Sequence, residues 1–167
     1  MLSILQVELD DHRHHLKELW WEYLCWANSM NIKELGVNLD IKAMLEQDMV
    51  ELGRFSPPNG CLLLAQCKTQ IAGCACMEKI AEDTGGIKRM FVRQTFRGKG
   101  IGRALLESVI DQVREIGYSR IRLDSARYMK EAQTLYHSVG FKDIEPFAES
   151  EIPEEFHTHW VFMEITL

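Results

Sequence analysis

The sequence predicts an α/β or α+β fold in which a mixed sheet is flanked by helices. The chain has 167 residues, 46% of them hydrophobic and 26% charged, which is enough for one substantial core. Strand-length apolar runs alternate with segments whose apolar residues recur at helical spacing. No internal repeat or second core is visible. We therefore expect one domain over residues 1–167, with the element order β-α-α-β-β-β-α-β-α-β-β.

The first third of the chain predicts one strand and two helices. Residues 3–8 form the strand, after which Asp10 or Asp11 can cap a long helix. Its apolar face is formed by Leu16, Leu19, Trp20, Tyr23, Leu24 and Ala27. The second helix has Asp40 as its N-cap and ends at Gly53.

The remainder predicts six strands and two helices. The strands, recognised by their apolar and β-branched residues, cover residues 61–67, 71–79, 87–93, 118–123, 141–144 and 160–165. Glycines 85–86 introduce the third of these strands. One helix runs over residues 99–116 and is closed by Gly117, and the other runs over residues 130–139 and is stopped by Gly140.

Composition and charge exclude several classes of protein. The formal net charge of −6 argues against a nucleic-acid partner, because duplex binding depends on cationic contacts to phosphate. No apolar run approaches the roughly 20 residues that a membrane helix needs. The N-terminal segment has no basic stretch typical of a secretory signal, and the five cysteines form no CxxC pair. We expect a cytoplasmic protein with reduced thiols.

A glycine-rich loop lies between a predicted strand and a predicted helix. Residues 92–103 read VRQTFRGKGIGR. Its glycines are Gly98, Gly100 and Gly102, and its cations are Arg97, Lys99 and Arg103. Glycines let backbone N–H groups approach a bound anion, and the helix N-terminus adds about half a positive charge. A phosphate or pyrophosphate would suit this loop.

Three other interpretations of the loop are possible. The glycines can simply shape a tight turn with solvated cations. A Walker nucleotide loop requires Ser or Thr after its lysine, and neither follows Lys99. A dinucleotide fingerprint requires a third glycine where Arg103 stands, although Asp124 lies about twenty residues on, where a ribose-binding acid is expected.

Motifs at three separated places resemble the GCN5-related N-acetyltransferase (GNAT) superfamily. Arg97, Gly100 and Gly102 match its [Q/R]xxGx[G/A] loop. The run IKRMFV at 87–92 resembles its central strand, and AQTLYHSVGF at 132–141 resembles its AxxLYxxxGF helix. The resemblance covers roughly residues 61–144, and it implies a mixed, mostly antiparallel sheet flanked by helices.

The resemblance implies an acyltransferase that passes an acetyl group from acetyl-CoA directly to a primary amine of a small molecule or peptide. The CoA pyrophosphate would sit on the glycine loop, and the pantetheine arm would pair with the central strand. The implied cosubstrate-binding residues are Met90, Phe91, Val92, Arg97, Gly98, Lys99, Gly100, Ile101, Gly102 and Arg103. Tyr136 matches the acid that protonates the departing thiolate. Relatives often dimerise, which leaves a homodimer open.

The chain departs from the family pattern at two positions. Many relatives carry a glutamate base where Gly86 stands, and Met129 replaces an asparagine that often contacts the CoA arm. Carboxylates that could replace the base are Glu78, Glu82 and Asp83, which are nearby in sequence, and Glu22 on the first predicted helix. A water relay is a further option. The missing glutamate also keeps open a noncatalytic acyl-CoA-binding or sensing domain, which detectable transfer to any amine would exclude.

The acceptor side and a metal site have weaker sequence signals. The resemblance implies that the first two helices and the loop over residues 145–158 wall the acceptor pocket. Trp21 falls off the buried face of the first helix and could contact a substrate, a second subunit or solvent. Paired metal ligands at i, i+2 spacing are Cys74, Cys76, His157 and His159. Ordinary strand alternation explains this spacing, so we expect no metal.

Overall fold

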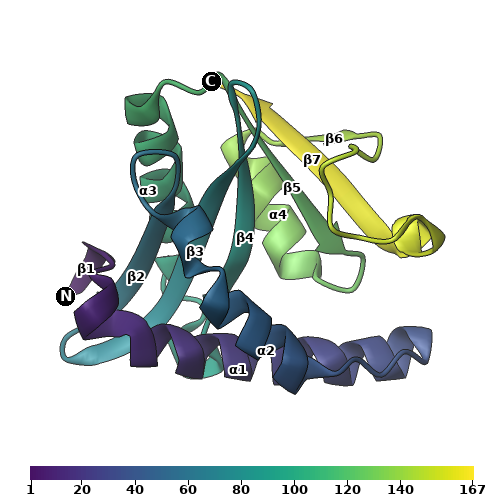
Figure 1. Ribbon diagram of the computed structural model, residues 1–167, viewed down its shortest axis with the longest axis horizontal. Helices are drawn as coiled ribbons and strands as arrows, with labels where there is room; N and C mark the ends of the chain where they lie inside the picture. The colour runs from purple at the N-terminus through teal and green to yellow at the C-terminus, as the bar shows by residue number, and fades with distance from the viewer.

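A computed structural model describes residues 1–167 and has the predicted order of helices and strands (Figure 1). The strands are β1 (Leu2–Gln6), β2 (Cys61–Cys67), β3 (Gln70–Ala81), β4 (Thr84–Val92), β5 (Arg120–Ala126), β6 (Lys142–Ile144) and β7 (Trp160–Thr166). The α-helices are α1 (Leu9–Leu35), α2 (Ile41–Val50), α3 (Ile101–Ile116) and α4 (Lys130–Val139). Short 3₁₀ helices cover Leu52–Phe55, Gln94–Phe96 and Glu154–His159.

The seven strands form one sheet in the order β1-β2-β3-β4-β5-β7-β6. Only β4 and β5 are parallel, so the sheet is mixed and mostly antiparallel, as expected. These two strands pair only from Thr84 to Gly86 against Arg120 to Arg122. Beyond that point they diverge, as Figure 1 shows. The divergence leaves backbone groups of both strands without a neighbouring strand.

A β-bulge interrupts β4 beside this divergence. Lys88 lies opposite Cys76 and Phe91 lies opposite Cys74, so β4 has one residue more than β3 over this stretch. Arg89, within the bulge, has a left-handed φ of 51°. Because of the extra residue, Phe91 lies on the same face of the sheet as Lys88, the face on which Cys74 and Cys76 are buried.

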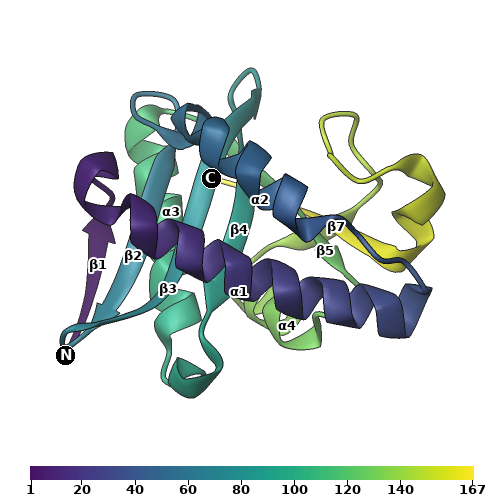
Figure 2. The same ribbon diagram turned by 60° about the horizontal axis from the view of Figure 1, so that its bottom comes forward.

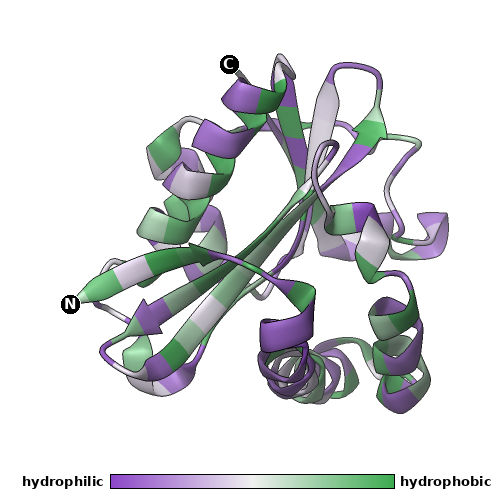
Figure 3. Ribbon diagram, turned by 60° about the vertical axis from the view of Figure 1, so that its left-hand side comes forward, coloured by the Kyte–Doolittle hydropathy of each residue, from purple (hydrophilic) through white to green (hydrophobic).

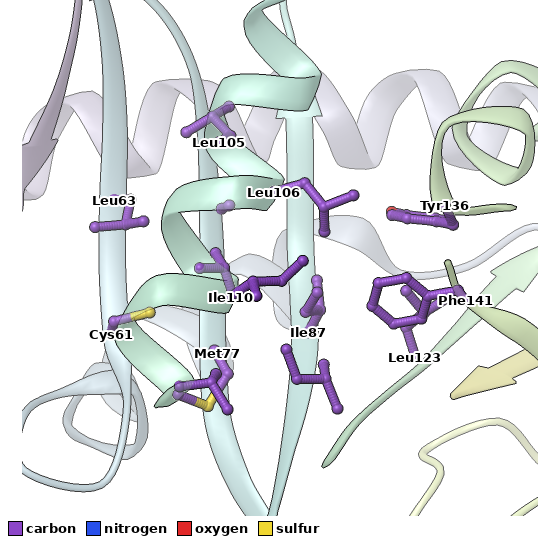
Figure 4. Packing of buried hydrophobic residues seen from close by; sticks show 14 of the residues in the cluster. Cys61, Leu63, Met77, Ile87, Leu105, Leu106, Ile110, Leu123, Tyr136 and Phe141 are labelled. Carbon is purple, nitrogen blue, oxygen red and sulfur yellow. The ribbon is translucent and has the colours of Figure 1, made fainter. Parts of the chain in front are cut away.

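Helices cover both faces of the sheet (Figure 2). Residues of α1 and α2 pack on one face, where the fully buried Trp20 meets Phe55 with ring centroids 6.0 Å apart. Residues of α3 pack on the other face in a larger cluster, shown close up in Figure 4. Hydrophilic and hydrophobic segments alternate along the helices in Figure 3, as expected for helices with one buried face.

The long helix α1 begins earlier than the sequence indicates. Its N-cap is Glu8, without a side-chain capping bond, and Asp10 and Asp11 lie inside the first turn. The expected aspartate cap is therefore wrong, although negative charge in a first turn still favours the helix dipole. None of the helices combines the length and apolar character needed to cross a bilayer.

The helix α2 begins as predicted and ends before the predicted glycine. The side chain of Asp40 accepts a hydrogen bond from the backbone N–H of Ala43 at 3.1 Å, which confirms the N-cap. The helix ends at Val50, and Gly53 lies inside the 3₁₀ helix that follows. That tighter turn buries Phe55, which explains why the helix does not run on to the glycine.

The glycine pair at 85–86 lies inside β4 and does not form a turn before it. A Cβ atom on Gly86 would stand 2.6 Å from the side chain of Ile80, and one on Gly85 would stand 2.8 Å from Met77. The glycines thus serve close packing against β3. This requirement depends on tertiary contacts, and glycine alone suggested a strand boundary.

Candidate functional site

A cleft of about 620 Å³ opens where β4 and β5 diverge. We call it the loop cleft, because the glycine-rich loop before α3 forms one wall and the start of α4 forms another. It gathers all but one of the residues expected to bind a cosubstrate, namely Met90, Phe91, Val92, Arg97, Gly98, Gly100, Ile101, Gly102 and Arg103. The exception is Lys99, which is exposed with its Nζ 5.5 Å from the ring centre of Phe96.

The glycine loop has the backbone geometry of an anion-binding turn. Gly98 and Gly100 have φ values of 76° and 78°, a region that other residues rarely adopt. Gly100 is the N-cap of α3, and no side chain caps this helix end. The space where a side chain at Gly100 would stand is open. The free N–H groups of the first turn of α3 are therefore available to an anion.

Two loop cations are already engaged by the protein. The Nε of Arg97 donates to the backbone carbonyl of Val92 at 2.9 Å, which ties the loop to the end of β4. A terminal nitrogen of Arg103 donates to the hydroxyl of Ser138 at 2.7 Å, linking α3 to α4. Both guanidinium groups still line the loop cleft and add positive charge to its wall.

Tyr136 projects from α4 to the inner end of the loop cleft. It is buried, with its hydroxyl 3.8 Å from the sulfur of Met90 and its ring 5.7 Å from that of Phe141. Figure 4 shows Tyr136 beside Phe141 and Leu123 at one end of the cluster. Burial, with smaller contributions from Tyr23 and Asp124, raises the pKa of the Tyr136 phenol. The phenol therefore keeps its proton at neutral pH.

A second pocket, of about 310 Å³, adjoins the loop cleft. We call it the helix pocket, because α1, α2 and the segment from Glu151 to Phe156 form its walls. Tyr23, Tyr128 and Met129 line both spaces, so the two meet at these side chains. The helix pocket lies where the first helices and the loop over residues 145–158 were expected to wall an acceptor site.

The carboxylates that the sequence offers as a base lie outside both the loop cleft and the helix pocket. Neither the loop cleft nor the helix pocket is lined by Glu22, Glu78, Glu82 or Asp83. Glu22 lies 2.9 Å from Arg93, and Glu78 lies 3.2 Å from Arg54. Asp83 accepts a hydrogen bond from the backbone N–H of Ser119.

Asp124 is a carboxylate of the helix pocket that the sequence does not offer as a base. It lies on β5, lines the helix pocket and contributes to the raised pKa values of both Tyr23 and Tyr136, where burial is the larger cause. The hydroxyl of Ser150 donates to one of its oxygens at 2.9 Å. The sequence pattern indicates Asp124 only as a ribose-binding acid. Its position two residues beyond the last β4–β5 pair is the signal that identifies it, because ligands bind where such strands diverge.

The remaining sequence candidates lie apart from both spaces or play other parts. Trp21 is 42% exposed and lines neither space, whereas Trp26 lines the loop cleft. Cys74 and Cys76 are buried under α1 and α2, and burial raises the pKa of Cys74 to about 12. No group of three or more His, Cys, Asp or Glu side chains is arranged to hold a metal ion.

Comparison with known sequences gives one family and several relatives. The model of the acetyltransferase (GNAT) family matches residues 14–141. An uncharacterized N-acetyltransferase of Schizosaccharomyces pombe is 30% identical over 158 residues, covering 91% of this chain and 90% of the relative. An IAA acetyltransferase of Azospirillum brasilense is 37% identical over 121 residues, covering 70% of this chain and 77% of the relative.

Solved structures share the fold at low sequence identity. An acetyltransferase of the GNAT family from Staphylococcus aureus superposes with a TM-score of 0.75 at 21% identity, covering 100% of this chain and 99% of the other. A PaiA N-acetyltransferase from Thermoplasma acidophilum, in complex with coenzyme A, gives a TM-score of 0.72 at 16% identity, covering 100% of this chain and 99% of the other. These matches establish the same fold.

Proposed function

The chain belongs to the acetyltransferase (GNAT) family, and we propose on this basis that it transfers the acetyl group of acetyl-CoA to a primary amine by direct attack. One observation carries the proposal. The loop cleft extends from the glycine loop to Tyr136, and it shares the side chains of Tyr23, Tyr128 and Met129 with the adjoining helix pocket. A donor and an acceptor can therefore meet at Tyr23, Tyr128 and Met129.

The donor half of the proposal rests on the loop cleft. The pyrophosphate of acetyl-CoA would accept hydrogen bonds from the free N–H groups at the start of α3, with Arg97 and Arg103 adding positive charge. The unpaired edge of β4 at Met90 to Val92 would hold the pantetheine arm. Because Arg97 occupies the carbonyl of Val92, the arm would use other backbone groups of this edge unless Arg97 moves.

The chemical step needs a place for negative charge and a proton for the leaving group. The amine nitrogen forms a bond to the thioester carbon, and a backbone N–H of the diverging strand would stabilise the resulting oxyanion, worth about 3 kcal/mol. Collapse of this intermediate breaks the C–S bond. Tyr136 would then protonate the departing thiolate, as its raised pKa keeps the phenol protonated, and the proton that the attacking nitrogen loses on becoming an amide would restore the phenol.

An ammonium acceptor must lose a proton before it attacks. Asp124 supports this step best, because it is the carboxylate of the helix pocket whose charge is felt by Tyr136. One oxygen of Asp124 is held by Ser150, which leaves the other to accept the proton directly or through water. Asp124 would thus take the part that a glutamate at position 86 plays in many relatives.

A noncatalytic acyl-CoA-binding or sensing domain is the second candidate. Gly86 favours this noncatalytic function, because β4 carries no carboxylate in either space. A side chain at position 86 would also collide with Ile80. Incubation with acetyl-CoA and a panel of primary amines separates the candidates, with free thiol and acetylated product measured together. Stoichiometric appearance of both supports the enzyme. Acetyl-CoA binding without transfer supports the sensor.

A further inference from the structure

Lys88 is a mostly buried lysine that lines the helix pocket and has no partner for its ammonium group within the chain. The charged side chains that line this pocket are Lys88, Arg89, Asp124 and Glu151. Lys88 is only 9% exposed, and its ammonium group makes no hydrogen bond or ion pair with the rest of the chain. The ammonium group is not among the fully buried polar groups that lack a partner, so it is accessible from the pocket. A free cation that borders a pocket on a mostly buried side chain is available to an anionic group of a ligand.

Arg89, the other cation of the helix pocket, is already paired within the protein. Arg89 donates two hydrogen bonds to the carboxylate of Asp48, at 2.7 and 2.9 Å. Both of these side chains are mostly buried, so their charges cancel within the protein. An anionic ligand in the helix pocket would therefore meet Lys88 as its available cationic donor.

The acidic side chains near Lys88 are held by another residue. Arg54 lies 3.2 Å from Glu78 and 2.9 Å from Glu151, and neither carboxylate forms an ion pair with Lys88. Burial opposes ionisation of Glu151, but Lys88 and Arg54 outweigh it and lower the pKa of that carboxyl. The field of Lys88 is thus felt nearby, while its three N–H donors are unused.

Asp124 stands across the divergence from Lys88. Each lies two residues beyond the last β4–β5 pair, Gly86 with Arg122, and both line the helix pocket. The pocket thus has a cation on the β4 side and a carboxylate on the β5 side. A ligand with an anionic and a cationic group on neighbouring atoms complements this arrangement.

We propose that the acceptor is an amino acid, or a closely related amine with an adjacent carboxylate, and that it has an apolar side chain. Its carboxylate would bind Lys88, and its amine would face Asp124 and the thioester. The apolar body would contact the hydrophobic wall formed by Leu24, Val37, Leu39, Ile41 and Met44. This inference rests on the proposed acetyl transfer, and it adds the chemical class of the acceptor.

The test compares matched acceptors that differ only at the carboxylate. Leucine, methionine and phenylalanine are each assayed beside their carboxamides and their decarboxylated amines, with free CoA thiol as the readout. We expect at least one amino acid to exceed both counterparts in kcat/KM by tenfold or more. Lys88→Met should bring this ratio close to one, mainly by raising KM, and Lys88→Arg should retain part of it.

Control variants and a binding measurement keep the two proposals separable. Lys79→Met removes an exposed lysine of β3 outside the helix pocket and should leave the acid-to-amide ratio unchanged. Unchanged acetyl-CoA affinity in Lys88→Met shows that the variant is folded. Equal rates for acids and amides, a ratio insensitive to Lys88→Met, or no acetylated amino acid despite acetyl-CoA binding would each overturn the inference. Absence of acetyl-CoA binding would instead refute the proposed transferase.

Discussion

Asp48 of α2 accepts two hydrogen bonds from Arg89 of β4, and this pair fixes the helix against the bulge in the strand. Arg89 adopts a left-handed φ of 51° in the bulge, where a non-glycine residue is strained. Burial alone would lower the pKa of Arg89, but the hydrogen bonds and charge of Asp48 raise it instead. The pair therefore helps to hold the bulge that follows Lys88, a residue that lines the helix pocket.

Removing one member of this pair should destabilise the fold strongly. Asp48→Ala leaves the Arg89 guanidinium buried without its partner, so we expect the free energy of unfolding to fall by about 3 kcal/mol or more. Urea denaturation measures this free energy. The double variant Asp48→Leu with Arg89→Met should lose less stability than the summed losses of Asp48→Leu and Arg89→Met made singly. A loss below about 1 kcal/mol for Asp48→Ala would show that the pair is as weak as a surface ion pair.

Tyr136→Phe should separate catalysis from binding. The change removes the phenolic proton and keeps the ring that packs on Phe141, so the fold and acetyl-CoA affinity should persist. Steady-state assays should show kcat reduced about a hundredfold or more, with little change in KM. In the wild type, the raised pKa of Tyr136 predicts no loss of the acid form between pH 7 and 9. Turnover by Tyr136→Phe at the wild-type rate would exclude the acid role.

Asp124→Asn should create a defect that shrinks as the pH rises. Without the carboxylate, the enzyme must wait for acceptor that has already lost its proton in solution, and that fraction grows with pH. We expect kcat/KM to fall by about a hundredfold at pH 7 and by much less at pH 9.5. Asp83→Asn, in the turn between β3 and β4, is the control and should leave the profile unchanged. A defect of constant size at every pH would mean that Asp124 only positions the acceptor.

The buried thiols should make the fold sensitive to alkali. Burial raises the pKa of Cys61 and of Cys74 from 9.0 to about 12. The native state therefore holds these protons more tightly than the unfolded chain. As a consequence, the free energy of unfolding keeps its full value below pH 9 and falls as the pH rises from 9 towards 12. Each thiol contributes a slope of about 1.4 kcal/mol per pH unit in this range. Urea titrations at pH 8 and 10 should show a shallower decline for Cys74→Ala, and an identical slope would contradict this cause.

Local patterns were sufficient to predict the order of the elements. Helical spacing identified α1 and α3, and the glycines expected to close α3 and α4 do so with φ values of 99° for Gly117 and 119° for Gly140. The residues that the loop and central-strand motifs implied as cosubstrate-binding all line the loop cleft, apart from Lys99. These features depend on residues close together in the chain, or on a motif whose geometry is conserved by its function.

The helix pocket was beyond what local patterns predict. The bulge at Arg89 depends on how β4 pairs with β3, and a regular alternation of IKRMFV does not reveal the extra residue. Asp124 gains its importance from the divergence of β4 and β5, which brings it beside Tyr23 and Tyr136. Of the carboxylates that the sequence offered as a base, Glu78 pairs with Arg54 and Glu22 pairs with Arg93. Glu82 and Asp83 lie in the turn between β3 and β4.

A matched pair of glycine variants isolates the proposed donor site. Gly100→Glu would place a negative side chain in the open space at the start of α3, where the CoA pyrophosphate is expected. Gly117→Glu introduces the same side chain at a glycine of similar backbone strain, with φ of 99° and open space, at the far end of the same helix. The second variant therefore controls for strain and added charge.

Calorimetric titration of the wild type and both glycine variants with acetyl-CoA, CoA and NADH tests the central claim most directly. We predict micromolar binding of both CoA species and none of NADH by the wild type and Gly117→Glu, and loss of CoA binding by Gly100→Glu. Failure of the wild type to bind CoA, preference for NADH, or normal CoA binding by Gly100→Glu would contradict the donor site on which the account rests.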